Sequence, residues 1–251
     1  MNRLNSFTKP VVIAHRGACA YAPENTLSAF KKAIEQGADG IEFDVKLTKD
    51  GHVVIMHDPT LERTTNGSGR VMDHTLAELK MLDAGAHFSP EFTGEPVPTL
   101  RDVLETVGDR LYLNIELTNY AAPLDALPVK VAQVIKDYAF HDNILFSSFN
   151  LLTLLRIRRL LPHIPVAVLA LPGIPGIPAR GLTGRLFAPD IVHPYYKDVT
   201  PAYVQRQKKL GRRVHVWTVN DPHTMLNLFH FGVQGIITDD PVLALQRREQ
   251  A

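Results

Sequence analysis

Short apolar runs rich in Val and Ile recur along the chain and alternate with stretches in which apolar residues have helical spacing. Each run has the length of a strand and is bounded by Gly, Pro or polar residues, which is typical of a buried strand. The pattern predicts eight strands, at Val11–His15, Gly40–Val45, Leu111–Leu117, Ile144–Phe149, Val166–Ala170, Asp190–His193, Val214–Val219 and Gly235–Thr238.

Most of the stretches between these runs are amphipathic. In Glu24–Gln36 the apolar residues Leu27, Phe30 and Ala33 have helical spacing, and Gly37 follows where a left-handed cap is needed. Eight strands alternating with helices predict an α/β fold, a TIM-type (β/α)8 barrel with its chemistry at the C-terminal strand ends. A doubly wound open sheet is the alternative. Similar patterns predict helices at Leu124–Tyr138, Leu151–Leu161, Pro201–Leu210 and Pro222–Phe231.

A ninth apolar run, Val53–Asp58, follows Val45–Thr48 closely. The Asp50-Gly51 pair between two alternating runs is a strong hairpin signal, so we expect an antiparallel arm outside the barrel. If Asp50 and Gly51 form a two-residue loop, the register sets Asp44 opposite His57, with both at the barrel mouth.

Two longer stretches lack the strand and helix pattern. Residues 59–98 contain one short helical pattern, Leu76–Leu82, and are too long for an ordinary loop. We expect them to form a small insertion over the C-terminal mouth, within a single barrel domain of residues 1–251. The Gly- and Pro-rich stretch Leu171–Phe187 is expected to be a mobile loop without a helix and not a membrane anchor.

Composition narrows the class of protein. The chain has 251 residues, 45% of them hydrophobic, and its net charge of +1 lacks the basic excess of a nucleic-acid binder. The single cysteine, Cys19, excludes a disulfide framework and a Cys-based zinc site and fits a reducing compartment. The first residues have no signal-peptide core, and no apolar run approaches the ~20 residues of a membrane span. We therefore expect a cytoplasmic protein with no stable membrane insertion; the oligomeric state stays open.

Three carboxylates end two neighbouring barrel strands. Glu42 and Asp44 point to the same face of one strand, ~7 Å apart, because side chains alternate. Glu116 ends the next barrel strand. Converging carboxylates form a hard-oxygen site for Mg²⁺ or Ca²⁺. The alternative is that they are separately solvated or paired with helices.

Histidine and arginine follow the first strand and the hairpin arm. His15 and His57 can act as acid and base near neutral pH, and Arg16 offers a planar fork to phosphate oxygens. Gly17 lacks the Cβ that would hinder a ligand from approaching the backbone. Two histidines, an arginine and a divalent cation at one mouth are what cleavage of a phosphodiester requires.

The chain resembles the glycerophosphodiester phosphodiesterase family, barrel enzymes of the phospholipase C-like superfamily. The resemblance rests on the blocks HRG, PENT, EFDV and HDPTLERTT, in this order. It continues through NIEL, SSF, VWTVN and GIITD and covers nearly the whole chain. It implies metal-dependent hydrolysis of small glycerophosphodiesters to glycerol 3-phosphate and an alcohol.

The resemblance also implies roles for individual residues. His15 and His57 become the acid/base pair, Arg16 a phosphate ligand, and Glu42, Asp44 and Glu116 the ligands of Mg²⁺ or Ca²⁺. Trp217 is expected to wall the alcohol side of the pocket or to serve in barrel packing alone.

One position departs from the family pattern. Many members have a lysine that helps to hold the phosphate where this chain has Thr118, so a positive charge is missing. Lys197, which follows the seventh strand, is our candidate for the substitute cation. His193, at the end of that strand, is a second candidate for substrate contact.

Other residues have two interpretations. Asp239 and Asp240 precede Pro241, so helix capping explains them as well as catalysis does. Asn25 is expected to cap the first helix, and nothing near Cys19 indicates a nucleophile.

Two alternative functions stay open. The first is lysophospholipase D-like cleavage of lysophospholipids. The second is a catalytically inactive barrel that binds phosphodiesters as a sensor, although binding alone needs no pair of histidines.

Overall fold

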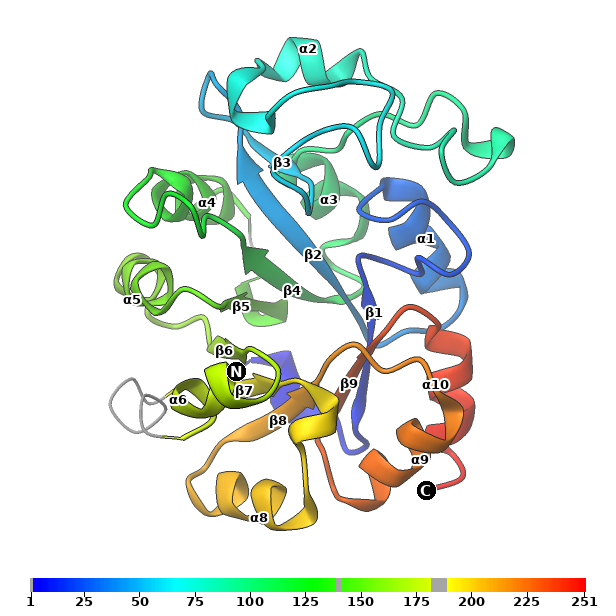
Figure 1. Ribbon diagram of the computed structural model, residues 1–251, viewed down its shortest axis with the longest axis vertical. Helices are drawn as coiled ribbons and strands as arrows, with labels where there is room; N and C mark the ends of the chain where they lie inside the picture. The colour runs from blue at the N-terminus through cyan, green and yellow to red at the C-terminus, as the bar shows by residue number, and fades with distance from the viewer. Residues whose placement is uncertain (1, 139–140, 182–188) are drawn as a thin grey trace.

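The computed structural model describes residues 2–138, 141–181 and 189–251, and its parallel strands form a closed ring (Figure 1). Within these residues eight strands pair in parallel in chain order, and the first pairs with both the second and the last. The predicted TIM barrel is therefore confirmed, and the open sheet is excluded. The eight strands are β1 (Val11–His15), β2 (Gly40–Leu47), β4 (Tyr112–Leu117), β5 (Ile144–Ser148), β6 (Val166–Ala170), β7 (Ile191–Pro194), β8 (Arg213–Val216) and β9 (Gly235–Thr238).

Helices surround this ring in Figure 1. Side chains accept hydrogen bonds at several of their N-termini, as in α1, where Thr26 Oγ1 accepts from the Ala29 amide. The predicted helices are all present, with shorter ends, and the described residues contain three more, which follow β3, β6 and β9. The described helices are α1 (Leu27–Glu35), α2 (Leu76–Lys80), α3 (Leu100–Val107), α4 (Leu127–Lys136), α5 (Leu151–Leu160), α6 (Ile177–Arg180), α8 (Pro201–Lys209), α9 (Pro222–His230) and α10 (Pro241–Arg248).

The strands bury both faces, which is why they read as continuous apolar runs. One face packs against the helices, as Phe43 of β2 does against Phe30 of α1, with ring centroids 5.5 Å apart. The opposite face fills the barrel with a second apolar cluster that includes Val11, Ile13 and Ile237. The barrel interior is therefore packed with side chains up to the level of its C-terminal mouth.

The predicted hairpin arm is present, with β3 (Val53–Ile55) antiparallel to β2. Val45 pairs with Ile55, and the Thr48 amide donates to the His52 carbonyl at 3.0 Å. The loop thus has three residues, closed by Gly51 with a φ of +79°. A three-residue loop with a left-handed third residue is a common hairpin form.

This loop corrects the expected register. With three loop residues instead of two, Asp44 lies opposite Met56, whose amide donates to the Asp44 carbonyl at 3.0 Å. The prediction that Asp44 faces His57 across the ladder was therefore wrong by one residue. His57 follows β3 and is placed by the chain that leaves the strand, not by the ladder.

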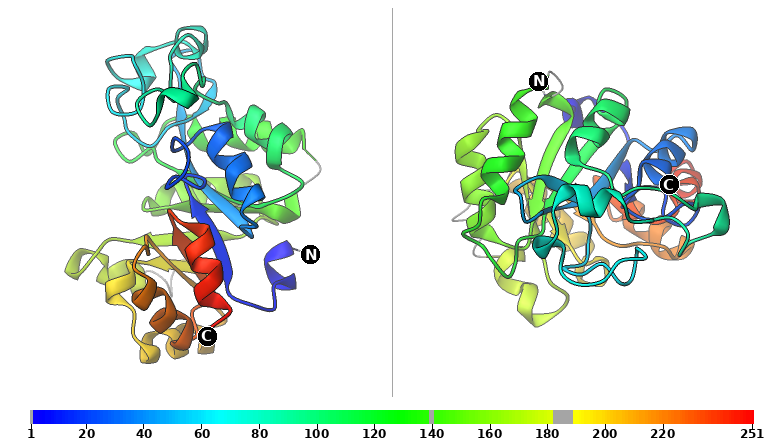
Figure 2. Two further views of the ribbon diagram at one scale, coloured as in Figure 1. Left: turned by 90° about the vertical axis from the view of Figure 1, so that its right-hand side faces the viewer. Right: turned by 90° about the horizontal axis from the view of Figure 1, so that it is seen from above.

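Residues 59–98 extend from the arm at one end of the long axis of the molecule (Figures 1 and 2). They contain α2 and two short 3₁₀ helices, Val71–Asp73 and Pro90–Phe92. A separate small apolar cluster holds this segment to β3. Glu95 accepts hydrogen bonds from the amide and the hydroxyl of Ser28, at 3.1 and 2.7 Å, which ties the segment to α1.

The stretch Leu171–Phe187 differs from its prediction as a loop without a helix. It contains a 3₁₀ turn, Ile174–Gly176, and the short helix α6, and residues 182–187 lie outside the described part of the chain. Among the described residues, none of the helices has both the length and the apolar character to cross a bilayer.

Substituting Gly51 tests the geometry of the turn. An added Cβ would meet nothing closer than Lys130 Cε at 3.5 Å, so the cost of Gly51→Ala comes from the backbone conformation. We expect a loss of about 1–2 kcal/mol in the free energy of unfolding, measured in urea. Gly51→Asn should cost less, because Asn tolerates positive φ. An Ala variant as stable as the wild type would contradict the three-residue loop.

Candidate active site

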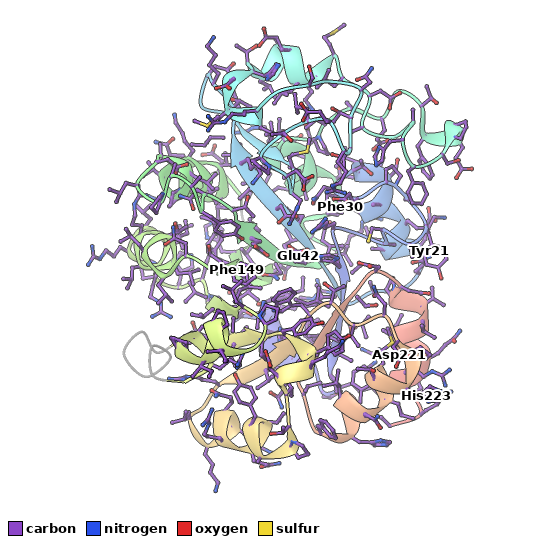
Figure 3. The ribbon with its side chains drawn as sticks, viewed as in Figure 1. Tyr21, Phe30, Glu42, Phe149, Asp221 and His223 are labelled. Atoms are coloured by element: carbon purple, nitrogen blue, oxygen red, sulfur yellow. The ribbon has the colours of Figure 1, made fainter. Side chains whose placement is uncertain are left out.

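A pocket of about 120 Å³ lies at the C-terminal mouth of the barrel. It brings together the residues that end β1, β2 and β4 and the start of the chain after β3. Figure 3 labels Glu42 of β2 and Phe149, which follows β5, both near the middle of the molecule. The pocket is lined by His15, Arg16, Glu42, Asp44, His57, Asn114, Glu116, Phe149, Leu169, Trp217, Thr218 and Ile237.

The three predicted carboxylates converge. Glu42 and Asp44 lie on the same face of β2, and the parallel register sets Asp44 beside Glu116 of β4. Their carboxylate oxygens all lie within 4.8 Å of one another. Such a spacing allows all three to bind one ion.

Burial and mutual repulsion both oppose ionisation of the three carboxyl groups. Burial, followed by the charges of Asp44 and Glu116, raises the pKa of Glu42 well above its usual range. Burial and the charge of Asp44 raise the pKa of Glu116 to about 8. Three ionised carboxylates are therefore costly here unless a cation lies among them. The donor set, oxygen only, suits a hard divalent cation.

The turn after β1 points backbone and side-chain donors at these carboxylates. Arg16 has a φ of +53°, and its amide donates to Oε2 of Glu42 at 3.1 Å. Its guanidinium donates to Glu24 at 2.8 Å and lies with Nε 3.5 Å from Asp44 Oδ2. A Cβ at the next residue, Gly17, would lie 2.6 Å from Ala29 Cβ, so only glycine allows this turn to pack on α1.

His15 is oriented by a second carboxylate. Its Nδ1 lies 2.6 Å from Asp239 Oδ1, whereas its Nε2 lies 4.0 Å from Glu42 Oε2. Burial alone would raise the pKa of Asp239, but the hydrogen bond and charge of His15 lower it to about 2. Asn220 donates to the other Asp239 oxygen at 2.6 Å. We infer that His15 donates from Nδ1 to an ionised Asp239 and presents Nε2 to the pocket.

Asp240, and not Asp239, caps the last helix. Asp240 Oδ1 accepts from the Leu243 amide at 3.0 Å. The sequence left the two aspartates equivalent, and the structure separates their functions. Cys19 Sγ donates to Asp239 at 3.1 Å, and its pKa is raised by burial, so it is a poor nucleophile.

His57 has a similar support on the arm. Its Nδ1 lies 2.7 Å from Asp58 Oδ1. Hydrogen bonds from Arg63 and His57 outweigh the effect of burial and hold the pKa of Asp58 well below its usual range. Arg63 also donates to Glu24, which links the arm to the turn after β1.

Asn25 is not the helix cap that the sequence suggested. It is buried, with a φ of +58°, and the cap is Thr26. Asn25 Nδ2 donates to Asp44 Oδ2 at 3.0 Å, and its Oδ1 accepts from the Asp44 amide at 3.3 Å. Asn25 therefore holds one carboxylate of the cluster in place.

The structure does not bring His193 or Lys197 into the pocket. β7 continues to Pro194, so His193 lies inside the barrel, fully buried and stacked on His215 with ring centroids 5.4 Å apart. Burial lowers the pKa of His193 to about 3. Lys197 lies on an exposed 3₁₀ turn, with Nζ 5.7 Å from the centre of the Tyr196 ring.

Trp217 does line the pocket, as part of an aromatic wall. Its ring is 5.6 Å from that of Phe149 and 5.7 Å from that of Tyr195, and Phe149 is 5.8 Å from Tyr120. The four rings come from the ends of β4, β5, β7 and β8. Phe149 and Trp217 line the pocket and give it an apolar side, opposite its charged residues.

A lysine that the sequence analysis missed lies beside the carboxylates. Lys46 Nζ donates to Thr118 Oγ1 at 2.8 Å. Burial lowers the pKa of Lys46, against the opposing charges of Asp44, Glu116 and Asp58. The signal in the sequence was the alternation Glu42, Asp44, Lys46, which sets all three on one face of β2.

Known proteins resemble this chain throughout its length. Residues 15–243 match the family model described as the Glycerophosphoryl diester phosphodiesterase family. A glycerophosphodiester phosphodiesterase of Caldanaerobacter subterraneus subsp. tengcongensis is 44% identical, over 93% of this chain and 95% of that protein. One from Bacillus subtilis is 33% identical, over 93% and 84%. The structure of an Oleispira antarctica phosphodiesterase in complex with the product sn-glycerol-3-phosphate has a TM-score of 0.89 at 32% identity, covering 99% of both chains.

The raised pKa values predict how pH affects the chelated protein. A carboxyl group whose pKa is higher in the folded than in the unfolded protein stabilises the fold at low pH. This contribution is complete below the unfolded pKa, 4.5, and is lost as pH rises through the folded pKa, which is about 8 for Glu116. In EDTA, we expect the melting temperature of the wild type to fall between pH 5 and pH 8. This fall should exceed that of Glu116→Gln by at least about 2–4 °C. Mg²⁺ or Ca²⁺ at pH 8 should recover that loss in the wild type.

Differential scanning fluorimetry measures both effects. Parallel curves of melting temperature against pH for the wild type and Glu116→Gln would contradict the crowding of charge at this site.

Proposed function

This chain belongs to the glycerophosphoryl diester phosphodiesterase family of hydrolases, and from that premise we propose that it cleaves glycerophosphodiesters with a divalent cation and a pair of histidines. The resemblance predicted from the HRG, PENT, EFDV and HDPTLERTT blocks is confirmed. The products would be glycerol 3-phosphate and an alcohol, and the Oleispira antarctica structure holds sn-glycerol-3-phosphate as its product. The observation that carries the proposal is the pocket in which His15 and His57 flank three converging carboxylates.

The carboxylate cluster fits a divalent cation. Its oxygens are close enough to share one ion, and a cation among them would offset the burial and the repulsion that raise the pKa values of Glu42 and Glu116. Glu42, Asp44 and Glu116 would hold the cation. Bound there, it would neutralise charge on the nonbridging oxygens of the phosphodiester. Mg²⁺ and Ca²⁺ both suit such ligands.

Arg16 is the proposed phosphate ligand from the protein. Its guanidinium keeps a hydrogen bond to Glu24, whereas its buried Nε has no hydrogen-bond partner among the described residues. This Nε lies 3.5 Å from Asp44 Oδ2 without forming a hydrogen bond, and a phosphate oxygen in the pocket would give it an acceptor.

The two histidines would divide the proton transfers. One takes a proton from the attacking oxygen, which belongs to water or to a substrate hydroxyl, and the other gives a proton to the leaving alcohol. Asp239 fixes the ring of His15 and Asp58 that of His57 through their Nδ1 atoms, so each ring keeps Nε2 for the reaction. The presence of two histidines, each held by a carboxylate, argues against a sensor without activity, since binding alone would not need such a pair.

The aromatic wall favours a second substrate class. Phe149 and Trp217 offer an apolar side for the leaving group, and the end of β6 continues into Leu171 and Ile174, which are 49% and 81% exposed. An acyl chain could lie on these side chains. Lysophospholipase D-like cleavage is therefore the alternative substrate range of the same site.

Release of glycerol 3-phosphate from glycerophosphocholine tests the proposal. We expect release with Mg²⁺ or Ca²⁺ and its loss in EDTA. Activity that survives exhaustive chelation would refute the cation, and no release from any glycerophosphodiester would refute the substrate class. Lysophosphatidylcholine measured in parallel decides the alternative, which gains support if the lipid is the faster substrate.

Single substitutions test the histidine pair. His15→Ala and His57→Ala should each lower kcat by about 10²–10⁴, the usual contribution of a positioned acid or base. Melting temperatures should stay close to that of the wild type, because neither ring lies in the apolar core. A substrate with a nitrophenol leaving group should rescue only the variant that lacks the acid. Wild-type turnover in either variant, on an unactivated substrate, would exclude its proton-transfer role.

A further inference from the structure

Lys46 is the third side chain on the face of β2 that carries Glu42 and Asp44. It is half-buried, whereas most lysines are fully exposed. No apolar or structural requirement explains a cation at this position, because β2 packs its other face, with Phe43 and Val45, against the helices. The site itself must account for it.

Thr118 holds the ammonium in a defined position. The Thr118 hydroxyl donates its only hydrogen to the Val45 carbonyl at 2.9 Å, so its oxygen is left as an acceptor. Lys46 Nζ donates to that oxygen at 2.8 Å and to the Thr118 carbonyl at 3.4 Å. Both partners are neutral, and in the part of the chain that the structure describes the ammonium has no ion-pair partner. A third N–H is therefore available.

The charges of the pocket indicate what this N–H binds. Three carboxylates exceed the charge of one divalent cation, and Arg16 is shared with Glu24. A site with excess negative charge repels an anionic phosphodiester, and repels the dianionic product more strongly. Lys46 supplies a positive charge on a flexible stem at the edge of the cluster, within the field of Asp44 and Glu116 but outside any ion pair among the described residues.

We propose that Lys46 binds the phosphate of the substrate and product, and that Thr118 is its positioning residue; this rests on the proposed function. Lys46 thus takes the place that the sequence analysis assigned to Lys197. The ligand class is a phosphate mono- or diester bound beside the carboxylate cluster.

Four single variants, one double variant and one control test the proposal. Lys46→Met removes the charge and keeps the stem; Lys46→Gln keeps a donor for Thr118 without the charge. Thr118→Val removes the acceptor at nearly constant volume, whereas Thr118→Ser retains it. Lys197→Met is the matched control, because it removes an exposed lysine from the same end of the barrel. The assays measure KM and kcat for glycerophosphocholine. Calorimetry measures the affinity for sn-glycerol 3-phosphate and, separately, for Mg²⁺ alone.

Both Lys46 variants should weaken sn-glycerol 3-phosphate binding about tenfold or more and raise KM more than they lower kcat. Thr118→Val should show a smaller loss and Thr118→Ser almost none. The double variant Lys46→Met with Thr118→Lys should recover part of the affinity, since it restores a cation from the neighbouring strand. Lys197→Met should match the wild type.

Unchanged affinity for sn-glycerol 3-phosphate in the Lys46 variants would overturn the proposal. So would a parallel loss of Mg²⁺ affinity, which would place the role of Lys46 in building the carboxylate cluster; removing a cation should leave Mg²⁺ binding as tight or tighter. The proposed function fails separately, if the wild type binds sn-glycerol 3-phosphate but releases none from glycerophosphodiesters.

Discussion

The repulsion among three carboxylates, two buried and one half-buried, is the constraint around which the barrel mouth is built. Parallel pairing of β2 with β4 sets Asp44 beside Glu116, and Glu42 lies on the same face of β2 as Asp44. A neighbouring group donates a hydrogen bond to each of the three. The Arg16 amide donates to Glu42, Asn25 to Asp44, and the Tyr120 hydroxyl to Glu116. Arg16 and Asn25 both have a positive φ, and both are residues whose donors reach the cluster.

The regular part of this arrangement was readable from the sequence. The strands and most helices were predicted because a barrel strand is buried on both faces and a covering helix on one, and both conditions leave a strong periodicity. The convergence of the carboxylates follows from the same period of two. His57 was expected near Asp44 for the wrong reason, since a single extra loop residue at Lys49 shifts the ladder. A two-residue and a three-residue loop share the Asp-Gly signal, so the register was not contained in it.

The contacts that hold the site residues in place could not be predicted from the sequence. Asn25 and Asp239 reach their partners from segments 19 and 224 residues away, and both resemble ordinary caps when only their neighbours in the chain are considered. Lys46 was in view as part of an alternating strand, but its partner Thr118 is 72 residues distant. His193 and Lys197 were predicted to contact the substrate, but neither lines the pocket. They follow the right strand, yet one residue of extra strand length at Pro194 leaves His193 inside the barrel, and Lys197 lies on an exposed turn.

His15 and His57 belong to parts of the molecule with different mechanical character. His15 ends a strand that pairs with a barrel strand on each side. His57 follows a three-residue strand that pairs with β2 on one edge and bridges to Thr99 through Val54 on the other, and a small apolar cluster of its own backs this strand. Local opening of such an arm breaks fewer contacts than opening of the ring. Warming is therefore expected to displace His57 from the mouth before the ring of strands opens, while His15 and the three carboxylates keep their places on the ring. Heat inactivation and unfolding of this enzyme would then be two separate transitions.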